Sequence, residues 1–475
     1  MSEQPLSLAG TAAASPLGFY SWTLGQAARD PYYIIVVIYI FYPYFSSTVV
    51  GDPVRGQALI GYLGAVGGVL LALMAPILGA IADKHGRRKP WIASATCVMA
   101  VGSACLWFVE PSSPVLGVYQ TLLLLLVIIV AFTISELFHN AMLPAIAPAA
   151  RVGEISGIAF ALGNWAGLFL MLFILIAFSL PGTDVWSFVP QDTLFGIDQS
   201  LHEHNRIVGP IAAAWMLVFT LPVLIFTPDV TASRISIPNA IRQGIADAVA
   251  TVTSLKHYSN IALFLLSRMF FFDGMVGVMT FVGIYAAGTF SWDTSTLLIF
   301  GLCSSGSAMF GAYIGGRIDD WLGSARTLKV AITFVTIIIL FLASIQPDSI
   351  LYGVPLSTAK VWDFPYFQTP AELIFFATNQ ISAMFFVTGL SSSRSLMARI
   401  SPPSMSAQFF GLYALSGTVT AFLAPLLVAT FTDWFESQQL GFASLSLLLI
   451  IGGVLLTRVK EEQGTAVDKK ATVGS

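Results

Sequence analysis

The chain has 475 residues, of which 56% are hydrophobic and only 10% charged, and its formal net charge is −3. Soluble proteins carry roughly 25% charged residues, so the composition excludes a soluble enzyme, a disordered or fibrous chain and a secreted disulfide scaffold. A polytopic membrane protein remains. At roughly 20 apolar residues per crossing, this length accommodates about a dozen transmembrane helices.

The apolar runs predict an all-α membrane protein with twelve transmembrane helices. The predicted spans are residues 22–46, 57–82, 90–108, 115–143, 153–179, 206–226, 258–288, 294–318, 327–345, 371–397, 406–430 and 439–457. With both termini in the cytoplasm, most of the 22 Lys and Arg residues fall in cytoplasmic segments, while only Arg55, Arg206 and Lys360 lie outside. This asymmetry follows the positive-inside rule. We therefore expect a multi-pass protein of a bacterial inner (plasma) membrane with both termini cytoplasmic.

Two loops of the chain repeat each other. The loop after the second predicted helix reads GAIADKHGRRKPW, and the loop after the eighth reads GRIDDWLGSAR, at an offset of 237 residues. Residues 140–157 and 394–411 form a second pair of similar segments. Two duplicated six-helix halves are thus expected, residues 1–226 and 258–475. Residues 227–257 would join them as a cytoplasmic linker containing an amphipathic helix.

The repeated loops predict an inner gate. A glycine at the end of the second helix, Gly79, would permit close helix packing, and Asp83 would cap a neighbouring helix or pair with an arginine. The gate residues expected from both copies and from the second repeated segment are Gly79, Asp83, Arg87, Arg88, Asp320, Arg326 and Arg394. The alternative is a basic loop that only anchors the topology.

Several of these segments resemble a known family. GAIADKHGRRKPWI is similar to the signature loop of the major facilitator superfamily, and GRRKPWI also resembles sugar symporters of the glycoside–pentoside–hexuronide group. SWTLGQAARDPYY, FHNAMLPAIAP and GLSSSRSLMARISP together resemble the vacuole-effluxer-like, autophagy-related branch. The resemblance implies the major facilitator fold, with the first, fourth, seventh and tenth helices lining a central cavity, and amino-acid efflux.

Charged residues within the first and fourth predicted helices are candidates for function, because a charge at the bilayer centre costs roughly 3 kcal/mol or more. Gln26 and Asp30 share a helix face, and Arg29 follows Gln26 by three residues. Glu136 and His139 share a face of the fourth helix, where an apolar wall favours a neutral carboxyl group and suits reversible protonation. The alternatives are an interfacial position for the first pair of charges and a helix-end capping cluster for the second.

The seventh and tenth predicted helices carry the remaining intramembrane charges. Arg268 and Asp273 point about 140° apart, so each is expected to find a partner on another helix. The charge-balanced choices are Asp273 with Arg29 and Glu136 with Arg268. Asn379 and Gln380 on the tenth helix would bind a polar solute or join helices together.

These features predict a secondary active transporter that moves an amino acid or related zwitterion or organic ion by alternating access, coupled to protons. The expected substrate-binding residues are Gln26, Arg29, Arg268, Asn379 and Gln380, and the expected proton-coupling residues are Asp30, Glu136 and Asp273. A cation-coupled sugar or glycoside symporter and a non-transporting receptor are the alternatives. No enzymatic activity and no cofactor or metal is expected, because GxxxxGK[ST] and HExxH are absent and the His202–His204 pair lies in a loop. The expected partners are the solute, H⁺ and the lipid bilayer, and the protein is expected to be a monomer.

Overall fold

A computed structural model describes residues 6–7, 12–84, 86–111, 115–148, 151–183, 185–229, 255–401 and 406–461, with scattered residues between 236 and 253. The elements are almost all helices, with one short hairpin of β1 (Ser349–Ile350) and β2 (Val354–Pro355). The chain divides into two compact units. The first comprises Met1–Gly51 and Leu73–Ala248, and the second comprises Asp52–Ala72 and Val249–Ser475. The third helix, α3 (Pro53–Lys84), contributes to both units.

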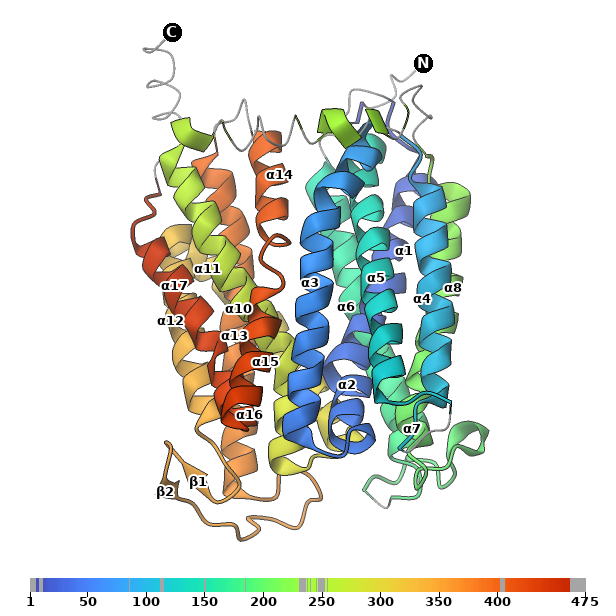
Figure 1. Cartoon of the computed structure of the whole chain (residues 1–475), viewed down its shortest axis with the longest axis vertical. Coiled ribbons are helices and arrows are strands. Elements are labelled where there is room, and N and C mark those ends of the chain that lie inside the picture. The colour runs from blue at the N-terminus through green and yellow to red at the C-terminus, as the bar shows by residue number, and fades with distance from the viewer. Residues whose placement is uncertain are drawn as a thin grey trace. The chain divides into compact units, whose positions relative to one another are not determined.

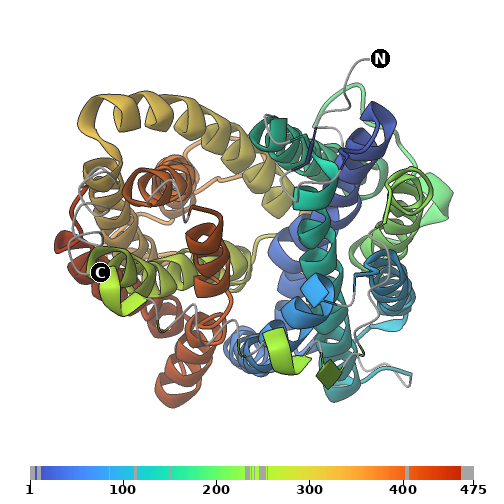
Figure 2. The same cartoon turned by 90° about the horizontal axis from the view of Figure 1, so that it is seen from above.

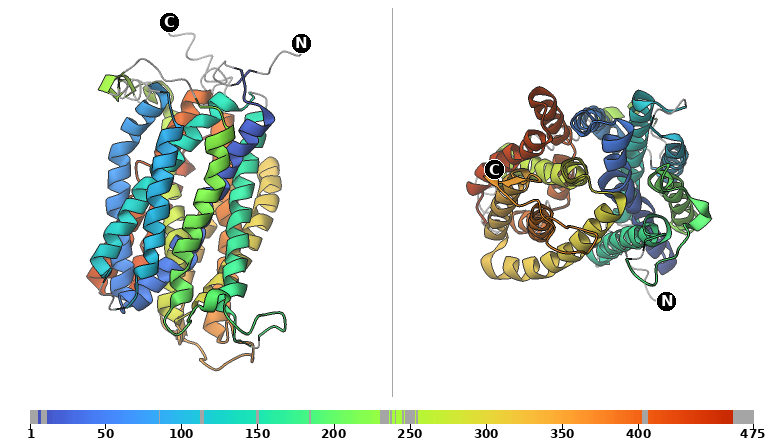
Figure 3. Two further views of the ribbon diagram at one scale, coloured as in Figure 1. Left: turned by 90° about the vertical axis from the view of Figure 1, so that its right-hand side faces the viewer. Right: turned by 90° about the horizontal axis from the view of Figure 1, so that it is seen from below.

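The first unit begins with a long, irregular helix. α1 (Pro16–Tyr32) continues through a π-helical stretch (Tyr33–Tyr39), α2 (Phe41–Tyr44) and a second π-helical stretch (Phe45–Val49). The other helices of this unit are α4 (Lys89–Cys105), α5 (Val118–Ile146), α6 (Val152–Ile174, extended to Ser179), α7 (Glu203–Arg206) and α8 (Val208–Phe226), with 3-10 turns at Leu106–Phe108 and Leu194–Gly196. α1 packs along α6 and α8, and α4 packs along α5 and α8 (Figure 3).

The second unit contains the remaining helices. They are α10 (Ser259–Phe290), α11 (Thr294–Leu322), α12 (Ser324–Ala343), α13 (Pro370–Ile400), α14 (Ser406–Ser416), α15 (Leu423–Phe435), α16 (Gln438–Ala443) and α17 (Leu445–Thr457), with a 3-10 turn at Leu255–His257. α13 packs against both α11 and α12, and α10 packs against α17 (Figure 2).

Local capping signals explain where several of these helices begin. Ser15 accepts a hydrogen bond from the N–H of Gly18 at the start of α1, and the Asp293 side chain accepts from Thr296 N–H at the start of α11. At α13, Thr369 and Glu372 form a reciprocal capping box. These polar caps satisfy the backbone donors that a helix start leaves free.

The membrane-spanning pattern agrees with the predicted spans. Within the described residues, eleven helices are long and apolar enough to cross a membrane, and a shorter apolar helix, Leu423–Phe435, lies where the eleventh span was predicted. The prediction of one continuous helix over 406–430 is wrong, because residues 417–422 form turns between α14 and α15 (Figure 1). Most of the predicted amphipathic helix in the 227–257 linker lies outside the described residues.

Candidate polar sites within the membrane helices

A hydrogen-bonded chain of three side chains lies on α1. The Gln26 amide nitrogen donates to both carboxylate oxygens of Asp30, at 2.8 and 2.9 Å, while its carbonyl oxygen accepts from Nη2 of Arg29 at 3.0 Å. Gln26 therefore connects the side chains of Arg29 and Asp30, which are consecutive in the sequence. Arg29 lies thirteen residues from the helix start at Pro16, or about 20 Å along the axis, which supports a position away from the membrane surface.

The Asp30 carboxylate fits against α6. A Cβ added at Gly163 would overlap Oδ2 of Asp30, so the glycine leaves the space that this acid occupies. Glu136 on α5 lies within electrostatic range of Asp30. The positive charge of Arg29 acts on the same carboxylate, so Asp30 lies in the field of a cation as well as of a second acid.

His139, which shares a helix face with Glu136 by its spacing, is bound to the backbone of Trp22 on α1. Its Nε2 lies 2.8 Å from the carbonyl oxygen of Trp22, the Trp22 indole N–H donates to the carbonyl oxygen of His139 at 2.8 Å, and the two rings stack at 4.5 Å. Because a carbonyl only accepts, Nε2 donates in this contact, and in a neutral imidazole Nδ1 then holds the lone pair. The contact joins α5 to α1, whereas Glu136, three residues earlier on α5, is only partly buried.

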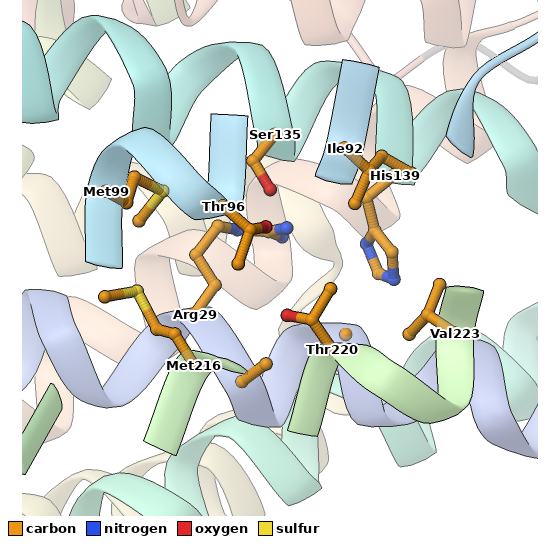
Figure 4. Close-up of a pocket in the computed structure, with 11 residues that line it drawn as sticks. Arg29, Ile92, Thr96, Met99, Ser135, His139, Met216, Thr220 and Val223 are labelled. Carbon is orange, nitrogen blue, oxygen red and sulfur yellow. The ribbon is translucent and has the colours of Figure 1, made fainter. Parts of the chain in front are cut away.

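A small cavity inside the first unit is lined by Arg29 and His139 (Figure 4). Its volume of about 10 Å³ matches one water molecule. The lining hydroxyls of Thr96, Ser135 and Thr220 point toward Arg29 in the close-up. Nε of Arg29 and Nδ1 of His139 are buried and, within the described part of the chain, have no hydrogen-bond partner. This donor and this acceptor suit a single buried water.

In the second unit, Arg268 and Asp273 on α10 hold the two ends of a broken helix. Nη1 of Arg268 donates to the carbonyl of Tyr413 at 2.7 Å and to Oγ of Ser416 at 2.8 Å, at the end of α14. Oδ2 of Asp273 accepts from the N–H of Ala424 at 2.9 Å, at the start of α15. A cation thus lies at a helix C-terminus and an anion at a helix N-terminus, and both positions are electrostatically favourable.

These contacts supply partners for three of the four charges that we expected to pair with one another; the fourth is Glu136. Arg29 bonds to Gln26, and Arg268 and Asp273 bond to the ends of α14 and α15. Each partner comes from the same unit as the charge that it contacts. The pairings of Asp273 with Arg29 and of Glu136 with Arg268 stay predictions.

Asn379 and Gln380 connect α13 to α11. Nδ2 of Asn379 donates to Oγ of Ser304 at 3.0 Å, and Oε1 of Gln380 accepts from Oγ of Ser307 at 3.0 Å. Asn379 is 6% exposed. This geometry fits the alternative in which the two amides join helices.

An acid after the last helix of the first unit caps α4. Asp229 accepts from the backbone N–H groups of Arg88, at 3.0 Å, and Lys89, at 3.1 Å. Nζ of Lys89 donates to the carbonyl of Leu224 at 2.9 Å, near the end of α8. We call this pair of contacts the first clasp; it connects the start of α4 to the end of α8.

The second unit repeats the arrangement around Glu461. This carboxylate accepts from Ser324 N–H at 3.3 Å, Ala325 N–H at 3.0 Å and Nη1 of Arg399 at 2.8 Å. Nζ of Lys329 donates to the carbonyl of Val459 at 3.3 Å, just after α17. These contacts form the second clasp. Burial opposes ionisation of Glu461, but the hydrogen bonds from Ala325, Arg399 and Ser324 outweigh it and hold the pKa of this carboxyl below its usual value.

The repeated glycines explain part of the loop motif. Gly86 and Gly323 have φ angles of 98° and 86°, which disfavour any residue with a side chain. The close packing predicted at Gly79 is wrong, because a Cβ there would meet nothing within 4 Å. The second glycine of the motif, therefore, has a conformational role, and the first faces open space.

The other predicted gate residues differ in their contacts. Arg87, Arg326 and Arg394 are exposed, and Nε of the buried Arg88 donates to the carbonyl of Ala82. The side chain of Asp83 lies outside the described residues. The side chain of Asp320 is 85% exposed and lies 3.9 Å from Arg399. Its neighbour Asp319 is the buried acid, and it bonds to Ser324 Oγ at 2.8 Å and to Arg399 at 3.3 Å.

Sequence reasoning missed Asp229, Asp319 and Glu461. Asp229 and Glu461 follow the last helix of their halves and lie 232 residues apart, close to the offset of the loop repeat. That spacing was a usable signal. Asp319 had no such signal, because Asp320 occupies the repeated position.

Comparisons with known proteins agree with this architecture. The family model described as "Vacuole effluxer Atg22 like" matches residues 47–469. The uncharacterized MFS-type transporter YxiO of Bacillus subtilis is 25% identical over 456 residues, which are 95% of this chain and 96% of that protein. Autophagy-related protein 22 of Cryptococcus neoformans is 22% identical over 54% of this chain, which spans only 45% of the fungal protein.

Solved transporter structures share the fold. A crystal structure of a D-xylose-proton symporter superposes with a TM-score of 0.64 at 12% identity, covering 94% of this chain and 98% of that one. The nucleoside transporter NupG gives 0.59 at 13% identity, covering 95% and 99%. The protein is thus a multi-pass membrane transporter of the major facilitator type and not an enzyme. It belongs to the Atg22-like vacuole effluxer family.

Proposed function

We propose that the chain moves a small polar solute, an amino acid or a related zwitterion or organic ion, by alternating access and that protons drive this transport. The observation that carries the proposal is the Arg29–Gln26–Asp30 chain, with Glu136 in electrostatic range of Asp30. An acid that is hydrogen-bonded to an amide and repelled by a second acid is suited to gain and lose a proton. The description of the family, vacuole effluxer, supports movement of a solute across a membrane.

The other candidate residues have supporting roles in this proposal. Arg268 and Asp273 would contact the solute or the proton where α14 and α15 separate, and Asn379 and Gln380 would hold α13 against α11 beside it. The clasps of Asp229 and Glu461 would act with the loop motif at the inner gate. Location in a bacterial inner membrane with cytoplasmic termini is part of the proposal.

Neutral amide variants test the coupling. In proteoliposomes, Asp30→Asn, Glu136→Gln and Asp273→Asn are measured for uptake of radiolabelled amino acids, pentoses and organic acids. Replacing a residue that carries the proton should abolish uptake driven by a pH gradient and leave counterflow exchange intact. Glu436→Gln, at an exposed acid, is the matched control.

Each outcome has a defined meaning. Gradient-driven accumulation that survives in all three variants would refute proton coupling through these acids. Uptake of a pentose without uptake of any amino acid would show that the solute is a sugar and not an amino acid. Binding without uptake of any solute would indicate a receptor.

A further inference from the structure

An open cavity lies where four helix ends of the second unit meet, and its volume is about 950 Å³. α11 ends at Leu322 and α12 begins at Ser324, while α13 ends at Ile400 and α17 at Thr457. Glu461, the acid of the second clasp, lies in the cavity wall, and its hydrogen bonds hold the start of α12 to the end of α13. Because these helices are long enough to span the membrane, the cavity lies at a membrane surface.

Basic side chains from three elements line this cavity. Arg326 and Lys329 lie in the first two turns of α12, Arg399 lies in the last turn of α13, and Lys460 follows α17. The backbone of Lys460 is held by Asn260 on α10, whose side chain accepts from the lysine N–H at 3.0 Å and donates to its carbonyl at 2.8 Å. The four cations are thus positioned by helices and by contacts with them.

The acids around the cavity neutralise one of these cations. Arg399 bonds to Glu461 at 2.8 Å and to Asp319 at 3.3 Å. The third acid, Asp320, also lies beside Arg399, at 3.9 Å. Within the described part of the chain, the other three cations have no acidic side chain within 4 Å. Like charges that line one cavity repel each other, and an anion that contacts several of them relieves this repulsion.

Exposed apolar side chains continue from the cavity along α12 and α17. On α12, Val330 follows Lys329 directly, and Phe334 lies one turn further along the helix. On α17, Val454 lies three residues before Thr457, which lines the cavity. The two helices pack against each other. A ligand at this position would therefore meet cations at the membrane surface and apolar side chains at the depth of the acyl chains.

We infer that this cavity binds the phosphate headgroup of an anionic phospholipid. The phosphate would accept hydrogen bonds from Arg326 and Lys460, with Lys329 in the same wall, and the acyl chains would lie along α12 and α17. Basic pockets at the ends of membrane helices are suited to such headgroups. A free phosphate shares the chemistry of the headgroup but gains nothing from the apolar side chains. This binding is independent of the transported solute and of proton coupling.

Lipid binding to the purified full-length protein in detergent tests the inference. The probes are dioleoyl phosphatidylglycerol, dioleoyl phosphatidylcholine, which has the same acyl chains, and glycerol phosphate, which has none, all at equal ionic strength. Native mass spectrometry measures the bound fraction, and thermal unfolding measures stabilisation. Phosphatidylglycerol at ten times its dissociation constant should raise the melting temperature by about 3 °C relative to phosphatidylcholine. Glycerol phosphate at the same concentration should leave it unchanged.

Two variants remove exposed cations of the cavity and keep long polar side chains, Arg326→Gln and Lys460→Gln. A basic residue near a membrane surface strengthens the binding of anionic lipid by about fivefold. Each variant should weaken phosphatidylglycerol binding by about that factor, and the double variant by about 25-fold. The matched controls are Arg317→Gln and Arg458→Gln, which change the same charge at exposed arginines outside the cavity lining. They should leave the dissociation constant nearly unchanged.

Loss of binding in the lining variants and not in the controls would support the inference. Equal stabilisation by the two lipids would overturn it, and so would equal losses in lining and control variants, which would indicate a general attraction to a basic surface. Binding of glycerol phosphate as tight as that of phosphatidylglycerol would contradict a lipid ligand and assign a soluble phosphate. Binding of phosphatidylglycerol only after removal of residues 465–475 would instead assign the cavity to that part of the chain.

Discussion

Replacing Gly163 with alanine tests the link between the Asp30 carboxylate and transport. The added methyl group would overlap Oδ2 of Asp30 and come within 3.1 Å of Cγ of Gln26, so the flexible acid side chain must shift from its position beside Gln26. Its two hydrogen bonds of 2.8 and 2.9 Å would be lost or lengthened. A hydrogen bond to a charged group contributes about 1.5–3 kcal/mol, and 2 kcal/mol corresponds to about 30-fold in an equilibrium.

The fold should tolerate the change, because an alanine within a helix is favoured over glycine by about 0.5–1 kcal/mol. We therefore expect a melting temperature close to that of the wild type and a loss of gradient-driven uptake of at least about tenfold. Counterflow of the same solute should fall less. The assay compares the two modes in proteoliposomes, with the solute that stabilises the wild-type protein most in a thermal-shift screen.

Gly157→Ala provides the matched control. This glycine lies six residues earlier on α6, and a Cβ there would meet nothing within 4 Å. It should leave both transport modes unchanged. Wild-type accumulation in Gly163→Ala would show that the position of the Asp30 carboxylate has no part in coupling. A large fall in the melting temperature would show instead that the glycine serves packing.

Three further predictions concern individual contacts. Glu461→Gln should destabilise the second unit by about 1 kcal/mol, the typical contribution of a helix cap, as measured by thermal unfolding. Because the native pKa of Glu461 is lowered, the stability that its carboxylate contributes should be complete above the usual value of 4.5 and be lost as the pH falls below that value. The variant should not show this loss. Trp22→Phe removes one hydrogen bond to His139 and keeps the stacked ring, so it should cost about 1–2 kcal/mol, whereas a loss of uptake at unchanged stability would argue for a direct transport role. Combining Asp273→Arg with Arg29→Asp tests the predicted pair: if the two residues are partners, the double variant should recover folded yield more than either single change, with a coupling energy above about 0.5 kcal/mol, whereas additive losses would mean that they do not interact.

Much of the architecture was predictable because membrane insertion depends on local composition. An apolar run of sufficient length predicts a helix wherever it occurs, so eleven of the twelve predicted spans correspond to long helices. The second glycine of the repeated Gly-Asp-Gly spacing likewise has a local role, since Gly86 and Gly323 both adopt a positive φ. The chain order of charges along α1 also showed that Gln26, Arg29 and Asp30 would meet, because neighbours three and four residues apart share a helix face.

The partners of most charges were decided by tertiary structure. Pro425 gave a local hint of an interrupted helix, but the caps for its two ends come from Arg268 and Asp273, about 150 residues earlier in the chain. His139 shared a helical face with Glu136 in the sequence, yet its ring is bound by the Trp22 backbone of another helix. Helical periodicity places a side chain on a face of its own helix, whereas the group that meets it depends on how the helices pack. The sequence by itself therefore determined which residues are polar in an apolar bundle, and only the folded chain determined which helix end, amide or ring satisfies each of them.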